Sequence, residues 1–270
     1  MTRTLPRETA LPPRPHRPLV AAGRAALTVL VAAAFAGSLV FVGFRPDRLV
    51  EGWSGMVDIL GRATPPRLDL DWPIIGRRVL ETLAIAFSGT LIALVLAFPL
   101  AILAARTITP HPLAYAAARA VIAVTRSIPG IVWALVFVAA VGLGPFAGVL
   151  AVSVHSIGML GRLIAEAIED GDRVPEQALT ATGATRMQIV SQAVVPGVAP
   201  TVLGVTLYRL DENVRDSIIL GVVGAGGLGF EIYTALNLFQ YKTAATLLLI
   251  TLVLVIVVER ISATLRKAVA

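Results

Sequence analysis

The chain has 270 residues, of which 56% are hydrophobic and 15% are charged, and its formal net charge is +6. Such a high apolar fraction excludes a soluble domain of this length and predicts an all-α, polytopic membrane protein. The absence of cysteine excludes disulfides and cysteine-bound metals, and the basic residues lie mostly at the ends of apolar runs, which argues against nucleic-acid binding.

The N-terminal part of the chain is predicted to hold a tail, one membrane span and a surface segment. Residues 1–24 are rich in Arg and Pro and have no apolar core, so we expect a cytoplasmic tail. Residues 25–44 carry no charge, which predicts a first transmembrane helix. Residues 45–78 are expected to form an extracytoplasmic loop. Its apolar residues recur with helical spacing, which predicts an amphipathic segment on the membrane surface: Leu49, Val50, Trp53, Met56, Val57 and Leu60.

Residues 79–270 are predicted to form a core of five transmembrane helices, for about six in total. The expected spans are Thr82–Ala105, about Ala116 to the turn at 142–145, Phe146–Ile168, Val198–Val222 and Thr243–Val258. Pro129, within the Arg-Ser-Ile-Pro-Gly string 126–130, predicts a kink in the second of these. Lys and Arg are about twice as frequent on the side of the termini and of loop 169–196 as on the other side. Both termini and this loop are therefore expected in the cytoplasm.

One polar segment, residues 174–196, lies between the apolar runs. It opens with Pro175 and Glu176, a favourable start for a helix, and Gly183 interrupts it. A second amphipathic piece with Met187 on its apolar stripe follows, and Pro196 is expected to end it. A helix–Gly–helix segment kept outside the lipid indicates a docking site for a partner. The alternative is an ordinary solvated loop between two spans.

A second polar segment, residues 206–217, is expected within a membrane span and carries five charges. Arg209, Glu212 and Asp216 share one helix face, and Asp211 and Arg215 are four residues apart beside it. Because an unpaired charge at mid-bilayer costs on the order of 3 kcal/mol or more, these groups should pair. They form either an ion-pair lattice that fixes the helix or part of a translocation path, and both roles are compatible. The excess of acids argues against a simple basic pocket for an anion.

Four glycines between residues 224 and 229 formally match the G-x-G-x-x-G pattern of dinucleotide sites. Apolar membrane segments flank them, however, so they are expected to permit close helix packing and hinge motion instead. The sequence has no nucleophile–base set, metal cluster or phosphate-binding loop. We therefore expect no enzymatic activity and no cofactor, and any ATP must be hydrolysed by a separate subunit.

Several segments together resemble the phosphonate-type ABC importer permeases, from about residue 75 to the C-terminus. They are RSIPG (126–130), AVGLGPFAGVLA (140–151), HSIGMLGRLIAEAIED (155–170), ATGAT (181–185), YRLDENVRDS (208–217) and GVVGAGGLGF (221–230). The resemblance implies the type I importer permease fold preceded by one extra helix, in the bacterial inner membrane. It also implies a homodimer, two cytoplasmic ATPase subunits and an extracytoplasmic substrate-binding protein.

The resemblance also implies roles for individual residues. The ATPase-coupling loop is expected to use Glu176, Gln177, Ala178, Gly183, Met187 and Pro196, although Gln177 and Ala193 depart from the family's loop pattern. The translocation path or gate is expected at Tyr208, Arg209, Asp211, Glu212, Asn213, Arg215, Asp216, Gly224, Gly226 and Gly227. The implied solute is a phosphonate or a related oxyanion such as phosphite or phosphate. The alternatives are a permease for another small solute, such as an amino acid, and a proton-coupled secondary transporter.

Overall fold

A computed structural model describes residues 18–109 and 111–269 of the chain. It forms two compact units, Met1–Asp58 and Ile59–Ala270, and every regular element in the described residues is a helix. Residues 1–17 of the expected tail lie outside the described residues, and residues 18–24 already belong to the first helix.

The first unit contains α1 (Pro18–Phe41) and most of α2 (Pro46–Ala63). Residues Gly23–Phe41 of α1 are apolar and long enough to cross a membrane, close to the predicted span 25–44. α2 forms where the apolar stripe predicts a helix, and it opens with Pro46 and Asp47 in its first turn, which is favourable there.

The first helix of the second unit, α3 (Trp72–Ala104), begins ten residues before the predicted start at Thr82. The side chain of Asp71 caps it by accepting a hydrogen bond from the Ile74 N–H at 3.4 Å, and Pro73 lies in its first turn. Residues 72–78, expected in the loop, are therefore the helical start of a long membrane span.

Small buried residues hold the centre of the second unit together. α3 packs along α6 (Pro145–Asp170) through fully buried side chains that include Ala86, Ala93 and Ala97 on α3 and Ala151 on α6. Small side chains let two helix backbones approach closely, which is the usual basis of helix association within a membrane. α3 and α6 are thus the framework on which the other helices pack.

The expected kink at Pro129 is a bend of 90° between α4 (Pro112–Ser127) and α5 (Gly130–Val141). Ile128 has extended backbone angles (φ −89°, ψ 122°), as the residue before a proline prefers. Pro129 has no N–H to donate to the preceding turn and its ring crowds that turn, which favours a break at this position. The stretch expected as one span is therefore two helices at right angles.

The polar segment forms two short helices, α7 (Val174–Ala181) and α8 (Arg186–Ile189). The sequence predicted that Pro196 ends the second helical piece, but the structure shows that it does not. A π-helical turn, η1 (Val190–Val194), leads directly into α9 (Val195–Leu220), and the Val195 N–H bonds to the carbonyl of Val190. This i→i+5 bonding shifts the hydrogen-bond register just before Pro196, which lacks a donor, so the helix continues.

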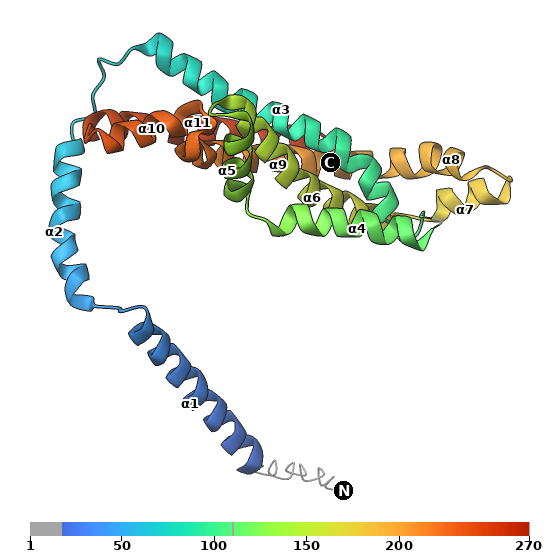
Figure 1. Ribbon diagram of the computed structural model, residues 1–270. Coiled ribbons are helices and arrows are strands. Elements are labelled where there is room, and N and C mark those ends of the chain that lie inside the picture. Colours follow the sequence, from blue (N-terminus) through green and yellow to red (C-terminus); the bar gives the residue numbers. More distant parts are fainter. Residues whose placement is uncertain (1–17, 110, 270) are drawn as a thin grey trace, which may run out of the picture. The chain divides into compact units, whose positions relative to one another are not determined.

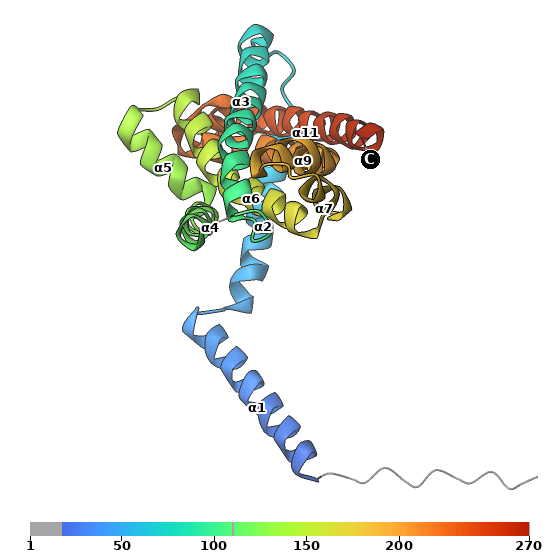
Figure 2. The same ribbon diagram turned by 90° about the vertical axis from the view of Figure 1, so that its right-hand side faces the viewer.

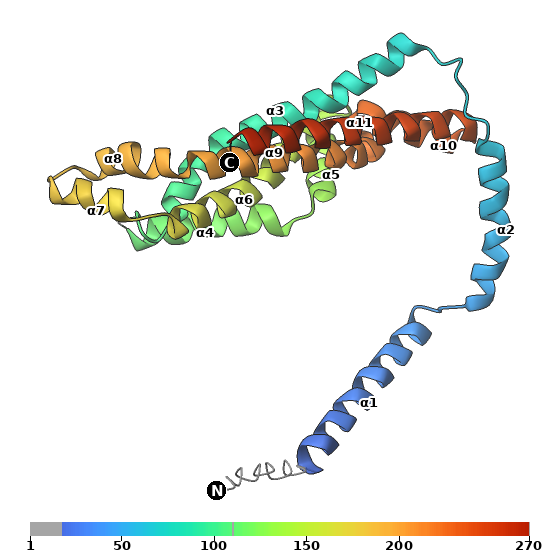
Figure 3. The ribbon, with the colours of Figure 1, turned by 180° about the vertical axis from the view of Figure 1, so that it is seen from behind.

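The chain ends with a second π-helical turn and two more helices: η2 (Gly221–Ala225), α10 (Gly227–Asn237) and α11 (Tyr241–Val269). In the second unit, α7 and α8 project from one end of the bundle and α10 lies at the other (Figures 1 and 3). Viewed along the bundle, α4 and α5 lie on one side of α3 and α6, and α11 on the other (Figure 2). Five described helices are long and apolar enough to span a membrane, or six if the bent pair α4–α5 counts as one.

Candidate functional site: the hairpin and the polar network

The hairpin of α7 and α8 is exposed and tightly turned. Neither helix contains a buried residue, and Gly183 between them has φ +79°, which L-residues rarely adopt. Thr185 starts α8 with a capping box, in which its N–H donates to Gln188 Oε1 at 2.8 Å. A Cβ on Gly183 would meet no atom of this chain within 4 Å. The backbone conformation of Gly183 therefore sets the turn, and no neighbouring side chain covers the turn at this residue.

The predicted coupling residues occupy different faces of the hairpin. Met187 is 76% exposed, and Gln177, Ala178 and Pro196 are exposed as well. Glu176 is half-buried and lines a cavity of about 340 Å³ between the hairpin and the loop that follows α3. Arg186 spans this junction by donating from Nη1 to the carbonyl of Ile108 at 3.2 Å. The exposed residues are thus available to a partner, whereas Arg186 attaches the hairpin to the loop after α3 and Glu176 faces the cavity beside this contact.

A buried chain of hydrogen bonds joins α9 to α6 and α3. Arg209, 5% exposed, pairs with Asp216 at 3.1 Å and donates from Nε to Ser156 Oγ on α6 at 3.1 Å. Ser156 donates to Asn213 Oδ1 at 2.9 Å, and Asn213 Nδ2 donates to Thr90 Oγ1 on α3 at 2.7 Å. We call these five residues the polar network. It satisfies a buried guanidinium and a buried amide in a setting where leaving them unpaired would be costly.

Arg215 lies at the centre of a separate acidic cluster. Its guanidinium contacts Asp211 at 3.1 Å, Glu212 at 2.8 Å and Glu259 of α11 at 3.4 Å. The expected Asp211–Arg215 pair therefore forms. Glu212 pairs with Arg215 and not with Arg209, although spacing placed it on the Arg209 face. Asp211 is buried, and its Oδ1 has no partner among the described residues. Arg215 is thus the only cation paired with Asp211 in the described chain.

The glycine segment packs at very close range, as its composition predicts. Gly224, Gly226 and Gly227 all have positive φ. A Cβ on Gly226 would lie 3.2 Å from Pro145, one on Gly227 would lie 2.6 Å from Thr82 Oγ1, and one on Gly224 would collide with Leu143. The Gly144 N–H also donates to the Gly224 carbonyl at 2.9 Å. A larger residue at any of these three positions would have a strained backbone and would press on the Leu143, Pro145 or Thr82 side chain.

A family model described as binding-protein-dependent transport system inner membrane component matches residues 97–270 of this chain. The chain belongs to this family. The permease is 42% identical over 221 residues to the phosphite transport system permease protein PtxC of Stutzerimonas stutzeri, covering 81% of this chain and 79% of that protein. It is also 42% identical over 226 residues to the phosphate-import permease protein PhnE of Mycolicibacterium smegmatis, over 84% of this chain but only 42% of that protein. The chain thus spans less than half the length of the mycobacterial relative.

The permease also resembles a solved ABC transporter. The inward-facing MetNI methionine ABC transporter contains a chain that matches with a TM-score of 0.65 and 25% identity, over 74% of this chain and 100% of that one. The fold is therefore that of the type I ABC importer permeases, in a multi-pass protein of the inner membrane.

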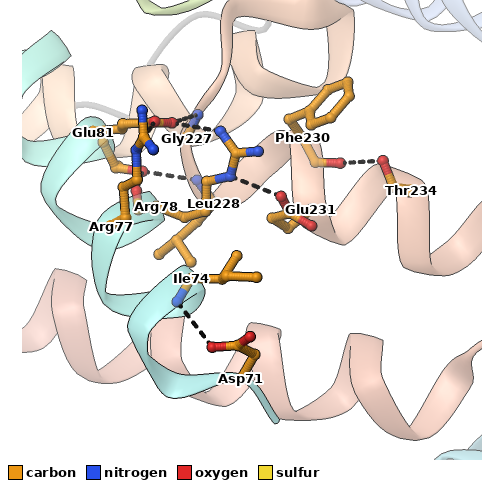
Figure 4. A network of polar contacts seen from close by, with 11 residues as sticks. Asp71, Ile74, Arg77, Arg78, Glu81, Gly227, Leu228, Phe230, Glu231 and Thr234 are labelled. Carbon is orange, nitrogen blue, oxygen red and sulfur yellow. Dashed lines mark hydrogen bonds and ion pairs between the residues drawn. The ribbon is translucent and has the colours of Figure 1, made fainter.

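A second polar network of the permease was missed by the sequence analysis (Figure 4). Arg78 of α3 contacts Glu81 at 2.8 Å and Glu231 of α10 at 2.7 Å. Glu81 accepts from the Gly227 N–H at 3.3 Å, and the Thr82 hydroxyl accepts from the Leu228 N–H at 2.9 Å. These side chains fix the start of α10 against α3. The sequence held two signals for this network: Arg78 and Glu81 are three residues apart, and Glu231 closely follows the glycines. They were missed because Arg78 was expected in a loop.

Among residues 18–109 and 111–269, no group of three or more His, Cys, Asp or Glu side chains could hold a metal ion. What the sites can do is mechanical and electrostatic, because they link helices through buried charges and leave the hairpin exposed.

Proposed function

We propose that this permease is the membrane subunit of an ATP-driven importer for a phosphorus oxyanion such as phosphite, phosphonate or phosphate. It works as a homodimer with two cytoplasmic ATPase subunits and an extracytoplasmic binding protein. Phosphite transport by PtxC and phosphate import by the mycobacterial PhnE support this solute class. The family's description as a binding-protein-dependent transport system supports delivery of the solute by a binding protein.

One observation carries the coupling mechanism: the two helices that enter and leave the hairpin also carry the polar network. α6 reaches the hairpin at Asp170 and contributes Ser156, while α9 continues from α8 without a break and contributes Arg209, Asn213 and Asp216. A displacement of the hairpin therefore acts on the network through helices, which are stiff compared with loops. This is the connection an importer needs between its ATPase and its solute path.

The residue roles follow from this connection. The hairpin couples to the ATPase through Glu176, Gln177, Ala178, Gly183, Met187 and Pro196. The solute path or gate comprises the α9 residues Tyr208, Arg209, Asp211, Glu212, Asn213, Arg215 and Asp216 and the loop residues Gly224, Gly226 and Gly227. The hairpin and both termini lie in the cytoplasm, in keeping with the distribution of Lys and Arg.

Transport by the reconstituted complex tests the proposal. The full chain is placed in liposomes with its cognate ATPase and binding protein, and uptake of labelled phosphite, methylphosphonate and phosphate is measured with ATP inside. Sulfate, a tetrahedral oxyanion without phosphorus, is the control. We expect saturable uptake of at least one phosphorus oxyanion, no sulfate uptake, and none with a non-hydrolysable ATP analogue. Uptake driven by a proton gradient without ATP, or preferential uptake of methionine, would overturn the proposal.

A further inference from the structure

A basic surface cavity of about 420 Å³ lies between the end of α2 and the α10–α11 turn, wholly within the second unit. Arg62, Arg67 and Lys242 line it together with Gln240 and Tyr241, and no carboxylate is among the lining residues. None of the predicted coupling or path residues contributes to it. The cavity is therefore a separate feature that the proposed transport cycle does not explain.

The backbone around this basic cavity is fixed by hydrogen bonds. The Arg67 N–H donates to the Lys242 carbonyl at 3.3 Å, and the Thr246 hydroxyl donates to the Arg67 carbonyl at 2.6 Å. The backbone N–H of Gln240 donates to the Ala235 carbonyl at 2.8 Å and closes the end of α10. The segment around Arg67 and the start of α11 are thus held together before any ligand binds. This lowers the conformational entropy lost on binding.

The charges around the basic cavity favour an anion. Arg67 is paired with Asp69 at 2.8 Å, whereas Lys242 has no ion-pair partner in the described chain. The first turn of α11, a helix of 29 residues, also forms part of the lining. Its unpaired N–H groups and the positive end of its dipole add to the attraction for a negative group.

An apolar groove adjoins the basic cavity on the other side of Arg67. It has a volume of about 520 Å³ and is lined by Pro65, Leu68, Trp72, Leu249 and Val253 among others. Thr246, which holds the Arg67 carbonyl, lines this groove as well. The two hollows therefore lie next to each other, joined by the Arg67–Thr246 hydrogen bond, and together present a charged end and an apolar end.

Aromatic residues place both hollows at the edge of the membrane. Trp72 begins α3 and Tyr241 begins α11, and Trp and Tyr at the ends of spanning helices typically lie at the level of lipid headgroups. We propose that the basic cavity and the apolar groove bind one anionic phospholipid. Its phosphate lies among Arg62, Arg67 and Lys242, and an acyl chain follows α11 past Leu249 and Val253. This site does not depend on which solute the permease carries.

Quenching of Trp72 fluorescence by brominated lipids tests the proposal. The chain has three tryptophans, so Trp53→Phe with Trp133→Phe leaves Trp72 as the single reporter, in the wall of the groove. This full-length variant is titrated in detergent with phosphatidylglycerol or phosphatidylcholine, both carrying the same brominated chains. We expect phosphatidylglycerol to quench Trp72 at a roughly tenfold lower mole fraction, because each basic side chain near an anionic headgroup contributes severalfold to affinity.

Two matched charge removals decide whether the basic cavity causes this preference. The variant Arg67→Gln with Lys242→Gln removes two charges from the cavity. Arg67 is paired with an aspartate two residues later in the chain, and Lys242 has no ion-pair partner in the described chain. Arg45→Gln with Arg48→Gln removes the same two kinds of charge outside the cavity, since Arg45 pairs with Asp47 at 2.9 Å. The first variant should lose the headgroup preference and the second should keep it, with both eluting as monodisperse protein. Should the first variant fail to fold, Lys242→Gln alone is expected to lower the preference about threefold.

Other results would overturn the proposal. Equal quenching by both lipids, or a preference that survives in the cavity variant or disappears in both variants, would mean that the basic cavity does not select the headgroup. Loss of the preference on adding submillimolar phosphite, but not sulfate, would mean that the basic cavity takes a free phosphorus oxyanion and not a lipid.

Discussion

Removing Arg215 should destabilise the permease far more than removing Asp211, although the two side chains form one ion pair. Asp211 is buried and its Oδ1 already lacks a partner, so Arg215→Ala leaves an uncompensated carboxylate inside the bundle. Asp211→Asn, by contrast, leaves Arg215 with Glu212 at 2.8 Å and Glu259 at 3.4 Å. The asymmetry follows from burial, since the Arg215 side chain is 40% exposed and that of Asp211 only 7%.

The size of the effect can be set from these exposures. Breaking a fully buried ion pair by removing one partner costs about 3–5 kcal/mol. Partial exposure of Arg215 screens the pair, so we expect about 2–3 kcal/mol for Arg215→Ala and less than about 1 kcal/mol for Asp211→Asn. At roughly 2–4 °C per kcal/mol, the first change lowers Tm by roughly 4–12 °C. Combining both changes should restore most of that loss, because the stranded charge is then gone.

Thermal unfolding in detergent and solute uptake, measured on both single variants and the double variant, check this reasoning. A double variant as unstable as Arg215→Ala, or an Asp211→Asn variant equally unstable, would refute the burial argument. If Arg215 instead contacts the transported anion, uptake will be absent in both variants that lack it even where Tm is normal. Comparing the two readouts therefore separates a structural role of Arg215 from a role in the solute path.

Three further outcomes are expected. Gly183→Asp should leave membrane insertion intact but abolish co-purification of the ATPase; wild-type recovery with normal transport would contradict the docking role of the hairpin. Cysteines placed at Ser54 and Thr64 in this cysteine-free chain should react with an impermeant thiol reagent from outside the cell, and labelling from the cytoplasmic side alone would invert the topology. Lipid selectivity measured through Trp72 should be constant between pH 5 and 8. The reason is that a hydrogen bond from Arg67 lowers the pKa of Asp69 below its ordinary value of 3.8, so the Asp69 carboxylate stays charged between pH 5 and 8. A lipid preference that changes with pH between these values would show that another group titrates.

Composition and spacing were enough to predict the architecture. Uninterrupted apolar runs indicate membrane spans because lipid tolerates few charges, and the helix–Gly–helix pattern indicates the hairpin because Gly183 readily adopts a positive φ. The Asp211–Arg215 pair was predictable because residues four apart share a helix face. Each of these inferences depends on neighbours within a few residues of one another.

The sequence could not show contacts between distant residues. Asn213 joins Thr90 and Ser156 across three helices, and a polar residue in an apolar run does not reveal its partner. Pro196 was expected to end a helix, because a change of hydrogen-bond register at 190–194 depends on backbone geometry that has no clear sequence signal. The early start of α3 was hidden by Arg77 and Arg78, whose charges resemble those of a loop until their acidic partners are known.

The glycine loop leaves no free space between itself and its neighbours, and this limits how the sequence can diverge. A Cβ on Gly226 would lie 3.2 Å from Pro145 and one on Gly227 would lie 2.6 Å from Thr82 Oγ1, so even a methyl group would push on these neighbours. A larger residue on either side is therefore tolerated only if the facing position shrinks or its helix shifts. Homologous permeases should accordingly vary at 82, 143 and 145 together with 224–227, or not at all.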